Sequence, residues 1–418
     1  MTCGACQFLV IENVKILIAS LIPTHPVTVG NRARILTLSK ALQALGHELH
    51  FAYAPLECGD ADDMRTFFGP ERFHVAEYRP TPALVQPFFA RQWRRVRRRL
   101  GFNSGHTYRI DDWYDSSLDT FFGKLATSLH FDVVIAEYAF LSRALTCFDQ
   151  RTTKIVDTHD RFSDRHKMFL IAGQPAGWFS TTLREELKGL RRADIVVAIE
   201  EQERDFFSDN LPDRTVITVG HLANESAPIT DWGRRVESSI LFVGAENQPN
   251  VAGLQYTIES VLPLVHARHP KAVVLLAGSI CASFPESPFV RKLGFVKDLA
   301  ELYAKTWIAL NPVHTGSGQS IKSVEALGYS VPLVTTVTGA RGLATSAEAA
   351  FLKVADKDAG AMADALVRLL ESAAERTSLS HAASRYVRGY NRLVQSRLIS
   401  ILPRQSANTA FPEPPRAY

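Results

Sequence analysis

The sequence predicts an α/β protein with two domains, each built on a parallel β-sheet that is covered by helices on both faces. Short runs of β-branched and other apolar residues alternate with longer amphipathic stretches along the chain. The same alternation starts again after a polar stretch at residues 224–239. The 418 residues are also enough for about two to three domains, so both patterns fit one chain.

In the first half, the apolar run at residues 14–20 is typical of a buried strand. A polar loop containing Gly30 follows, and apolar residues from Ile35 to Leu45 then recur at helical spacing. Further strands are expected at residues 48–54, 131–136, 154–157 and 194–198. Ligand sites of such sheets lie at the C-terminal ends of the strands.

In the second half, strands are expected at residues 240–244, 272–278, 308–311 and 332–335. One long, basic helical segment is expected from Ala359 to about Leu402, followed by a Pro-rich, disordered tail at residues 403–418. The expected division is a first domain at residues 1–227, a second at 228–384 and a final helix at 385–402. A cleft between the two domains is the expected site, because two sets of strand ends face each other there.

Charge and cysteine content exclude several function classes. The chain has 47 Lys and Arg against 43 Asp and Glu, and this net charge of +4 is too small to indicate nucleic-acid binding. Five cysteines form no disulfide framework, and a pair spaced as Cys3 and Cys6 is more often incidental than a metal or redox site.

The apolar start at residues 8–22 is interrupted by polar residues, so it falls short of the about 20 apolar residues that span a membrane. We therefore expect a cytoplasmic protein with at most a peripheral membrane contact.

The most informative segment, residues 311–328, follows a strand and opens an amphipathic helix. Gly316 and Gly318 allow a tight turn, and the helix N-terminus beyond them offers free N–H groups to an anion. Lys322 can add a positive charge for a phosphate, while Glu325 can accept hydrogen bonds from the vicinal hydroxyls of a ribose. This combination indicates a nucleotide. A helix cap with a surface Lys and Glu explains the same residues about equally well.

A longer series of segments makes the interpretation specific, because it resembles the donor-binding half of the family-4 retaining glycosyltransferases. The segments are residues 240–244, 248–253, 277–278, 293–299, 311–312, 316–318 with Lys322, 325–327, 331–336 and 339–342. The first half is similar at residues 23–32, 46–47 and 156–160. The resemblance implies a GT-B fold with an N-terminal acceptor domain, a C-terminal nucleotide-sugar domain and a final helix that crosses back to the first domain.

The resemblance also implies roles for individual residues. Glu325 would bind the ribose, and His159 would face the donor sugar from a strand end of the first domain. His159 and Lys322 would be the catalytic residues. The other implied donor-binding residues are Gly30, Asn31, Arg32, Gly244, Gly316, Ser317, Gly318 and Gln319.

This chain departs from the family pattern at two places. Ser317 stands where the E-x7-E pattern has its first glutamate, eight residues before Glu325. No basic pair follows Gly244, so compensation of the diphosphate charge is expected from Lys322, Arg32 and helix dipoles.

The implied reaction is transfer of a hexose-type sugar from a UDP- or GDP-sugar to a saccharide or lipid-linked acceptor, in surface polysaccharide or glycoconjugate biosynthesis. The anomeric configuration is retained, the leaving phosphate takes the acceptor proton, and neither a metal nor another cofactor is expected. Two alternatives stay open. One is a GT-B nucleotide-sugar epimerase or hydrolase, and the other is a non-catalytic nucleotide-sugar-binding subunit.

An arginine-rich segment at residues 91–102 carries six arginines. On a helix, Arg94, Arg95 and Arg98 fall on one face, which could lie on an anionic membrane surface or meet a lipid diphosphate acceptor. A solvated helix face is the more common outcome for such a segment.

Overall fold

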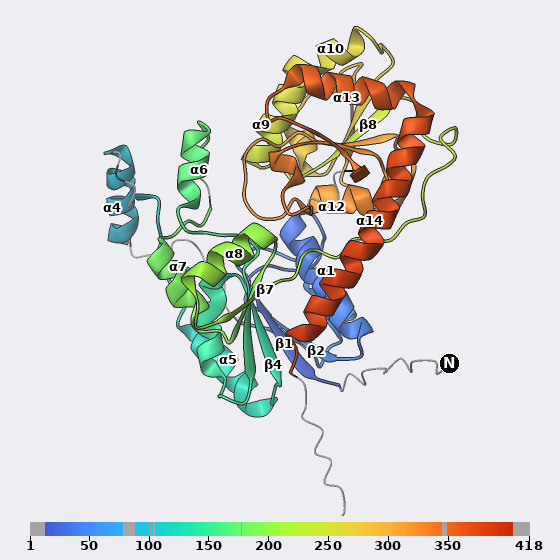
Figure 1. The fold of residues 1–418 in the computed structure, drawn as a ribbon. Coiled ribbons are helices and arrows are strands. Elements are labelled where there is room, and N and C mark those ends of the chain that lie inside the picture. Colours follow the sequence, from blue (N-terminus) through green and yellow to red (C-terminus); the bar gives the residue numbers. More distant parts are fainter. Residues whose placement is uncertain are drawn as a thin grey trace, which may run out of the picture.

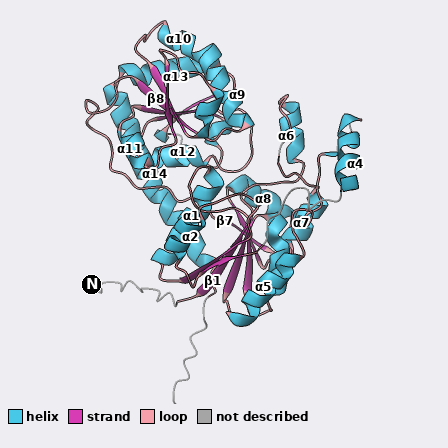
Figure 2. Cartoon of the chain, turned by 180° about the vertical axis from the view of Figure 1, so that it is seen from behind, coloured by secondary structure: helices cyan, strands magenta, loops and turns pink. Residues whose placement is uncertain are grey.

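In the computed structural model, the described residues are 13–77, 88–100, 102, 105–176, 178–344 and 349–403. They form two separate parallel sheets, each with helices on both faces (Figures 1 and 2). This arrangement confirms the α/β class and the two-sheet organisation. The Cys3–Cys6 pair and tail residues 404–418 lie outside the described residues.

The first sheet has the strand order β3-β2-β1-β4-β5-β6-β7, and all neighbouring strands are parallel. Its strands are β1 (Lys15–Ser20), β2 (Glu48–Tyr53), β3 (Phe73–Val75), β4 (Val133–Glu137), β5 (Thr153–Asp157), β6 (Ile195–Ala198) and β7 (Thr215–Thr218). Four consecutive residues of β1, from Ile16 to Ala19, have no exposed surface. A strand that is covered on both faces needs such a continuous apolar run, which explains why the strand was predictable.

The second sheet has the order β10-β9-β8-β11-β12-β13 and is also parallel throughout. Its strands are β8 (Ser239–Val243), β9 (Val273–Ala277), β10 (Val290–Gly294), β11 (Ile308–Asn311), β12 (Leu333–Thr336) and β13 (Leu352–Val354). Ile240 and Phe242 of β8 enter the hydrophobic core on one face, and Leu241 enters the core on the other. Side chains alternate along a strand, so one strand supports two cores.

The helices of the first domain are α1 (Gly30–Ala44), α2 (Ala61–Phe68), α4 (Phe88–Arg99), α5 (Ser117–Ser128), α6 (Arg165–Ile171), α7 (Leu183–Leu190) and α8 (Glu201–Asn210), with a 3-10 helix η2 (Ala139–Cys147). The second domain has α9 (Gln248–Tyr256), α10 (Leu262–His266), α11 (Leu299–Ala304), α12 (Ile321–Gly328), α13 (Ala359–Glu371) and α14 (Ala373–Ser400), with the short helical turns η3 (Thr257–Val261), η4 (Ser279–Ser283) and η5 (Thr338–Ala340). None of the helices in the described part of the chain is both long and apolar enough to cross a membrane.

The expected single helical segment from Ala359 to about Leu402 is instead two helices. The chain breaks at Ser372, whose hydroxyl accepts a hydrogen bond from the Glu375 backbone N–H and so caps α14. Helix α14 then crosses from the second domain to the first (Figure 1). Leu379 packs in a core of the second domain, whereas Leu398 packs in the core of the first. This helix therefore ties the two domains together.

Candidate active site

A cleft of about 340 Å³ lies between the domains, at the C-terminal ends of both sets of strands. The first domain contributes the start of α1 and one side of α6. The second contributes residues that follow β8, β9 and β11, together with the start of α12. Of the predicted donor residues, Gly30, Asn31, Gly244, Gly316, Ser317, Gln319, Lys322 and Glu325 line this cleft.

Two helix N-termini meet at the cleft. Helix α1 begins at Gly30 and α12 begins at Ile321, and the residue before each helix makes no capping side-chain hydrogen bond. Within α1, the Asn31 Oδ1 atom accepts from the Arg32 backbone N–H at 2.9 Å, so the N–H groups of Gly30 and Asn31 are the ones that remain for a ligand. The two ends are close, since a Cβ placed on Gly30 would lie 3.2 Å from the Ile321 Cδ1 atom. Uncapped N-termini leave backbone N–H groups free and carry partial positive charge. The cleft therefore holds two convergent anion-binding groups, one from each domain.

Lys322 and Glu325 lie on the first turns of α12, at the wall of the cleft. The Lys322 ammonium donates to the Asn250 Oδ1 atom and lies 4.7 Å from the centre of the Phe242 ring. Burial lowers the pKa of Lys322 to about 7, against the opposing effect of Glu325. Burial raises the pKa of Glu325 to about 7, and the nearby Lys322 opposes that shift.

The loop before α12 has the turn geometry predicted for its glycines, because Gly316 and Gly318 both have positive φ, 145° and 69°. Arg341 clamps this loop. Its Nε and Nη2 atoms donate to the Gly318 and Ser317 carbonyls at 3.0 Å each, and Nη1 donates to the Gly316 carbonyl. Three charge-assisted hydrogen bonds hold the loop beneath the cleft.

Gln319 was expected to contact the donor, and in the structure its side-chain amide makes hydrogen bonds to other residues of the protein. Its Oε1 atom accepts from the His221 backbone N–H at 2.7 Å, and its Nε2 atom donates to the Gly342 carbonyl and the Tyr390 hydroxyl at 3.0 Å each. Because Tyr390 belongs to the crossing helix α14, Gln319 connects the loop to the junction between the domains.

Arg32, which was expected over the phosphates, is not one of the residues that line the cleft. Its Nη2 atom pairs with the Glu57 carboxylate at 2.9 Å and also donates to the Cys58 carbonyl at 3.2 Å. The side chain thus runs to the loop after β2, and Asn31 is left to face the cleft.

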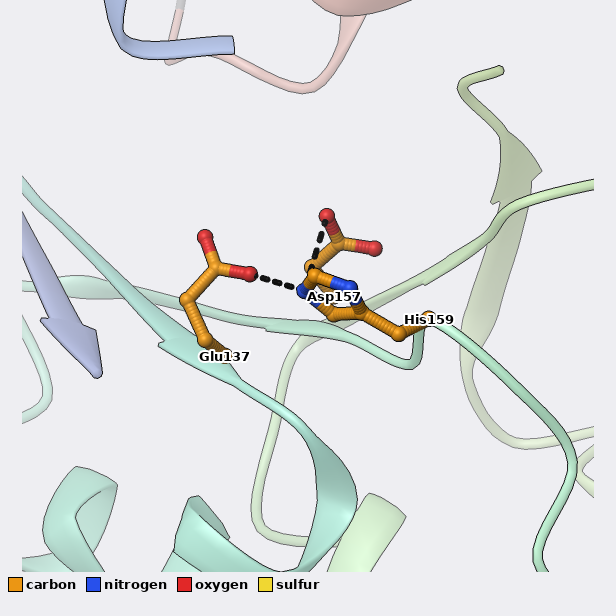
Figure 3. A group of neighbouring side chains, drawn as sticks. All are labelled: Glu137, Asp157 and His159. Carbon is orange, nitrogen blue, oxygen red and sulfur yellow. Dashed lines mark hydrogen bonds and ion pairs between the residues drawn. The ribbon is translucent and has the colours of Figure 1, made fainter. Parts of the chain in front are cut away.

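His159 lies just beyond the C-terminal end of β5 in the first domain. The residue is only 7% exposed, its ring stacks on Tyr138 with 4.0 Å between ring centres, and its Nε2 atom bonds to the Glu137 carboxylate (Figure 3). The ring therefore lies at the ends of β4 and β5, bonded to a first-domain carboxylate, and His159 is not one of the residues that line the cleft. Its backbone carbonyl instead faces the C-domain loop, 3.0 Å from where a Cβ on Gly318 would stand.

Glu137, Asp157 and His159 are the group of described residues whose ligand atoms lie close enough together, within 4.8 Å, to hold a metal ion. Arg34 already pairs with one carboxylate of this group. Its Nε and Nη2 atoms bind both oxygens of Asp157, at 2.9 and 2.7 Å, and the pair is almost fully buried. A guanidinium in this place opposes the binding of a cation.

The second domain resembles known proteins in sequence, and the whole chain resembles known proteins in fold. Residues 237–372 match the family model described as Glycosyl transferases group 1. The second domain resembles group 1 glycosyl transferases. No curated protein sequence matches the chain.

Three solved GT-B structures illustrate the likeness of the whole chain. A Staphylococcus aureus TarM mutant, solved with fondaparinux, α-GlcNAc-glycerol and UDP, has a TM-score of 0.65 at 10% identity, over 93% of this chain and 99% of that one. The pneumococcal O-GlcNAc transferase GtfA, solved with UDP and GlcNAc, has 0.64 at 10%, over 94% and 100%. Anabaena HepE, solved with UDP and glucose, has 0.58 at 14%, over 93% and 97%. The chain has the GT-B fold, as the resemblance implied.

Several cleft residues of this GT-B fold were missed as site residues. Phe295, Val296 and Leu299 contribute apolar side chains to the lining of the cleft. They lie in the segment 293–299, which carried part of the family resemblance without an assigned role. Arg165 comes from the seven-residue helix α6, which is too short to show a helical period in the sequence.

The arginines of α4 lie outside the cleft and differ among themselves. Arg94 stacks on the Tyr108 ring, 3.3 Å from its centre, and Arg98 donates to the Gly105 carbonyl at 2.8 Å. Arg95 is exposed. Only part of the predicted basic face is therefore available to a partner.

Proposed function

We propose that the protein is a retaining glycosyltransferase of the hexosyltransferase type that moves a sugar from a UDP- or GDP-sugar to a saccharide or lipid-linked acceptor, in surface polysaccharide or glycoconjugate biosynthesis. The observation that carries this proposal is the convergence of two uncapped helix N-termini, from α1 and α12, across the cleft between the domains. The group 1 match of residues 237–372 supports it independently.

The cleft offers a place for each part of such a donor. The diphosphate would lie between the N-termini of α1 and α12, close to Lys322. Glu325 would accept hydrogen bonds from the ribose hydroxyls, and Phe295 with Val296 would contact the base.

The chemical work of the protein is then electrostatic. When the glycosidic bond to the diphosphate breaks, negative charge grows on the departing phosphate, and the two helix ends are already oriented toward it. That phosphate takes the acceptor proton on the same face, so the configuration is retained without a protein nucleophile. No metal or other cofactor enters this proposal.

A lipid-linked acceptor is favoured by the surface around α4 and α6, which stand out together from the first domain (Figure 1). Segment 105–106 links the two helices, because Gly105 accepts from Arg98 and the His106 ring stacks on His166 of α6. Large apolar side chains are exposed on this surface: Trp93, Leu100, Phe102 and Ile171. Arg95 and Arg99 of α4 are exposed as well. Apolar side chains with arginines suit an anionic membrane, so we place the protein in the cytoplasm, peripheral to the membrane.

The donor proposal is tested by thermal unfolding with UDP, GDP, their sugars and NAD. A ligand at about 100 times its Kd should add about 2.7 kcal/mol to the free energy of unfolding. We expect one nucleotide sugar to stabilise the parent protein and to lose this effect in Glu325→Ala. Stabilisation by NAD alone, or by no nucleotide, would refute the donor assignment.

The membrane proposal is tested by sedimentation with vesicles of anionic or zwitterionic lipid. We expect the parent to sediment with anionic vesicles in a salt-dependent way, and the triple variant Arg95→Gln, Arg98→Gln, Arg99→Gln to stay in solution. The matched control replaces three arginines that are exposed elsewhere, Arg151, Arg234 and Arg268, with Gln. Equal sedimentation of both variants, or none by the parent, would count against a membrane role.

A further inference from the structure

Among the described residues, three basic side chains line the cleft: Arg165, Lys322 and Arg341. Two of them are engaged by the second domain. Lys322 donates to Asn250, and all three guanidinium nitrogens of Arg341 donate to loop carbonyls. Arg165 comes from the first domain, and within the described chain its two terminal nitrogens have no hydrogen-bond partner.

Arg165 is held in place by its third nitrogen. The Nε atom donates to the Asp160 Oδ2 atom at 2.9 Å, and the guanidinium packs 4.8 Å from the centre of the Phe169 ring. The side chain is 17% exposed, so it is oriented without being closed off from the cleft. The Nη1 and Nη2 atoms remain available to a ligand, as a planar pair that suits phosphate oxygens.

Asp160 also reaches across the domain boundary. The same Oδ2 atom accepts a hydrogen bond from the Ser317 hydroxyl at 2.8 Å. Ser317 belongs to the loop that leads into α12, so Asp160 brings the Arg165 guanidinium next to this loop. The cation and the α12 N-terminus therefore converge on one part of the cleft.

We infer that Arg165 binds the diphosphate of the donor from the first domain, and that Asp160 is the positioning residue that orients it. This inference rests on the proposed function and deepens it. Arg32, expected to supply this charge, is paired with Glu57, and no basic residue follows Gly244 at the end of β8. Arg165 supplies the positive charge that these two positions do not. Because Asp160 accepts a hydrogen bond from Ser317 of the second domain, the Arg165 guanidinium is held in position when the two domains are in contact.

The experiment compares nucleotides that differ only in phosphate. Calorimetry measures the affinities of UDP, UMP and uridine, or of the guanosine series, for the parent, Arg165→Gln and Arg165→Lys. Loss of a charge-assisted hydrogen bond should weaken diphosphate binding by about tenfold in Arg165→Gln, with partial recovery in Arg165→Lys. Nucleoside binding should change by less than about twofold. The control Lys167→Gln removes a positive charge from an exposed position of the same helix and should leave all affinities unchanged.

Asp160 is tested by a double-mutant cycle. Asp160→Asn should weaken diphosphate binding in the parent but add no further loss when Arg165→Gln is already present, since its effect passes through Arg165. A purely structural role would add to the loss and would weaken nucleoside binding as well.

The outcomes separate this inference from the proposed function. If the parent binds neither nucleoside diphosphate, the proposed function fails and the role of Arg165 fails with it. If the parent binds a diphosphate and Arg165→Gln binds it equally well, or loses nucleoside affinity to the same extent, only the Arg165 inference is overturned.

Discussion

Lys322 and Glu325 lie three positions apart on α12, at the wall of the cleft, and burial moves their pKa values toward each other, each to about 7. Desolvation disfavours the charged form of both groups, and their mutual attraction only partly restores it. Near neutral pH, a bound anion can therefore shift the protonation of this pair.

The first prediction is that donor affinity falls as pH rises through about 7. Below that pH Lys322 carries its proton and attracts the diphosphate, and above it the neutral amine does not. A nucleotide sugar is the suitable probe, because it lacks the terminal phosphate group that titrates near neutral pH. Calorimetry in buffers of different ionisation enthalpy should show proton uptake on binding. Lys322→Arg keeps its positive charge at all these pH values, so the fall in donor affinity should be absent in that variant. If the variant shows the same fall as the parent, the role of Lys322 is refuted.

The second prediction separates stability from binding at Glu325. The folded protein keeps the Glu325 proton up to about pH 7, whereas the unfolded chain loses it near the ordinary value of 4.5. This group therefore favours folding at low pH, and its contribution is lost as pH rises between those values. Glu325→Gln should raise Tm by about 2 °C near pH 8 while weakening nucleotide binding. A lower Tm in that variant would contradict the assigned pKa shift.

The third prediction concerns the buried pair of Arg34 and Asp157. Arg34→Met leaves the Asp157 carboxylate buried without its partner, and should lower the free energy of unfolding by about 3 kcal/mol. Urea unfolding measures this loss. The double variant Arg34→Met, Asp157→Asn should recover part of it, since no unpaired charge remains. Additive losses in the double variant would show that charge compensation is not the reason.

The fourth prediction distinguishes two roles of Gln319. As a junction residue, it connects His221, Gly342 and Tyr390, so Gln319→Ala should cost about 1–3 kcal/mol of unfolding free energy. Tyr390→Phe, which removes one hydroxyl of the same network, should cost about 1 kcal/mol. A donor-contact role predicts the opposite pattern, with lost nucleotide affinity and unchanged stability.

The predicted strands were found because their signal is local. Strands β1 and β4 contain continuous apolar runs, and the structure places the ends of the predicted strands within one or two residues of the expected positions. The expectation omitted β3, β7, β10 and β13, which are short strands at or next to the sheet edges with partly exposed residues. An edge strand that is paired on one side needs fewer apolar residues, so its pattern is weak.

The candidate site likewise has parts that a local sequence pattern predicts and parts that depend on distant residues. The glycine turn at Gly316 and Gly318 and the helix start beyond it are properties of a short segment, and residue types alone were enough to place an anion cradle there. The directions of the long polar side chains depend instead on distant partners. Arg32 pairs with Glu57 across 25 positions, His159 with Glu137 across 22, and Asp160 with Ser317 across 157. No local pattern encodes such pairs, because the first two form only when the first domain packs, and the third forms only when the two domains meet. The tertiary structure thus pairs Arg32 and His159 with first-domain carboxylates and places Arg165 at the cleft.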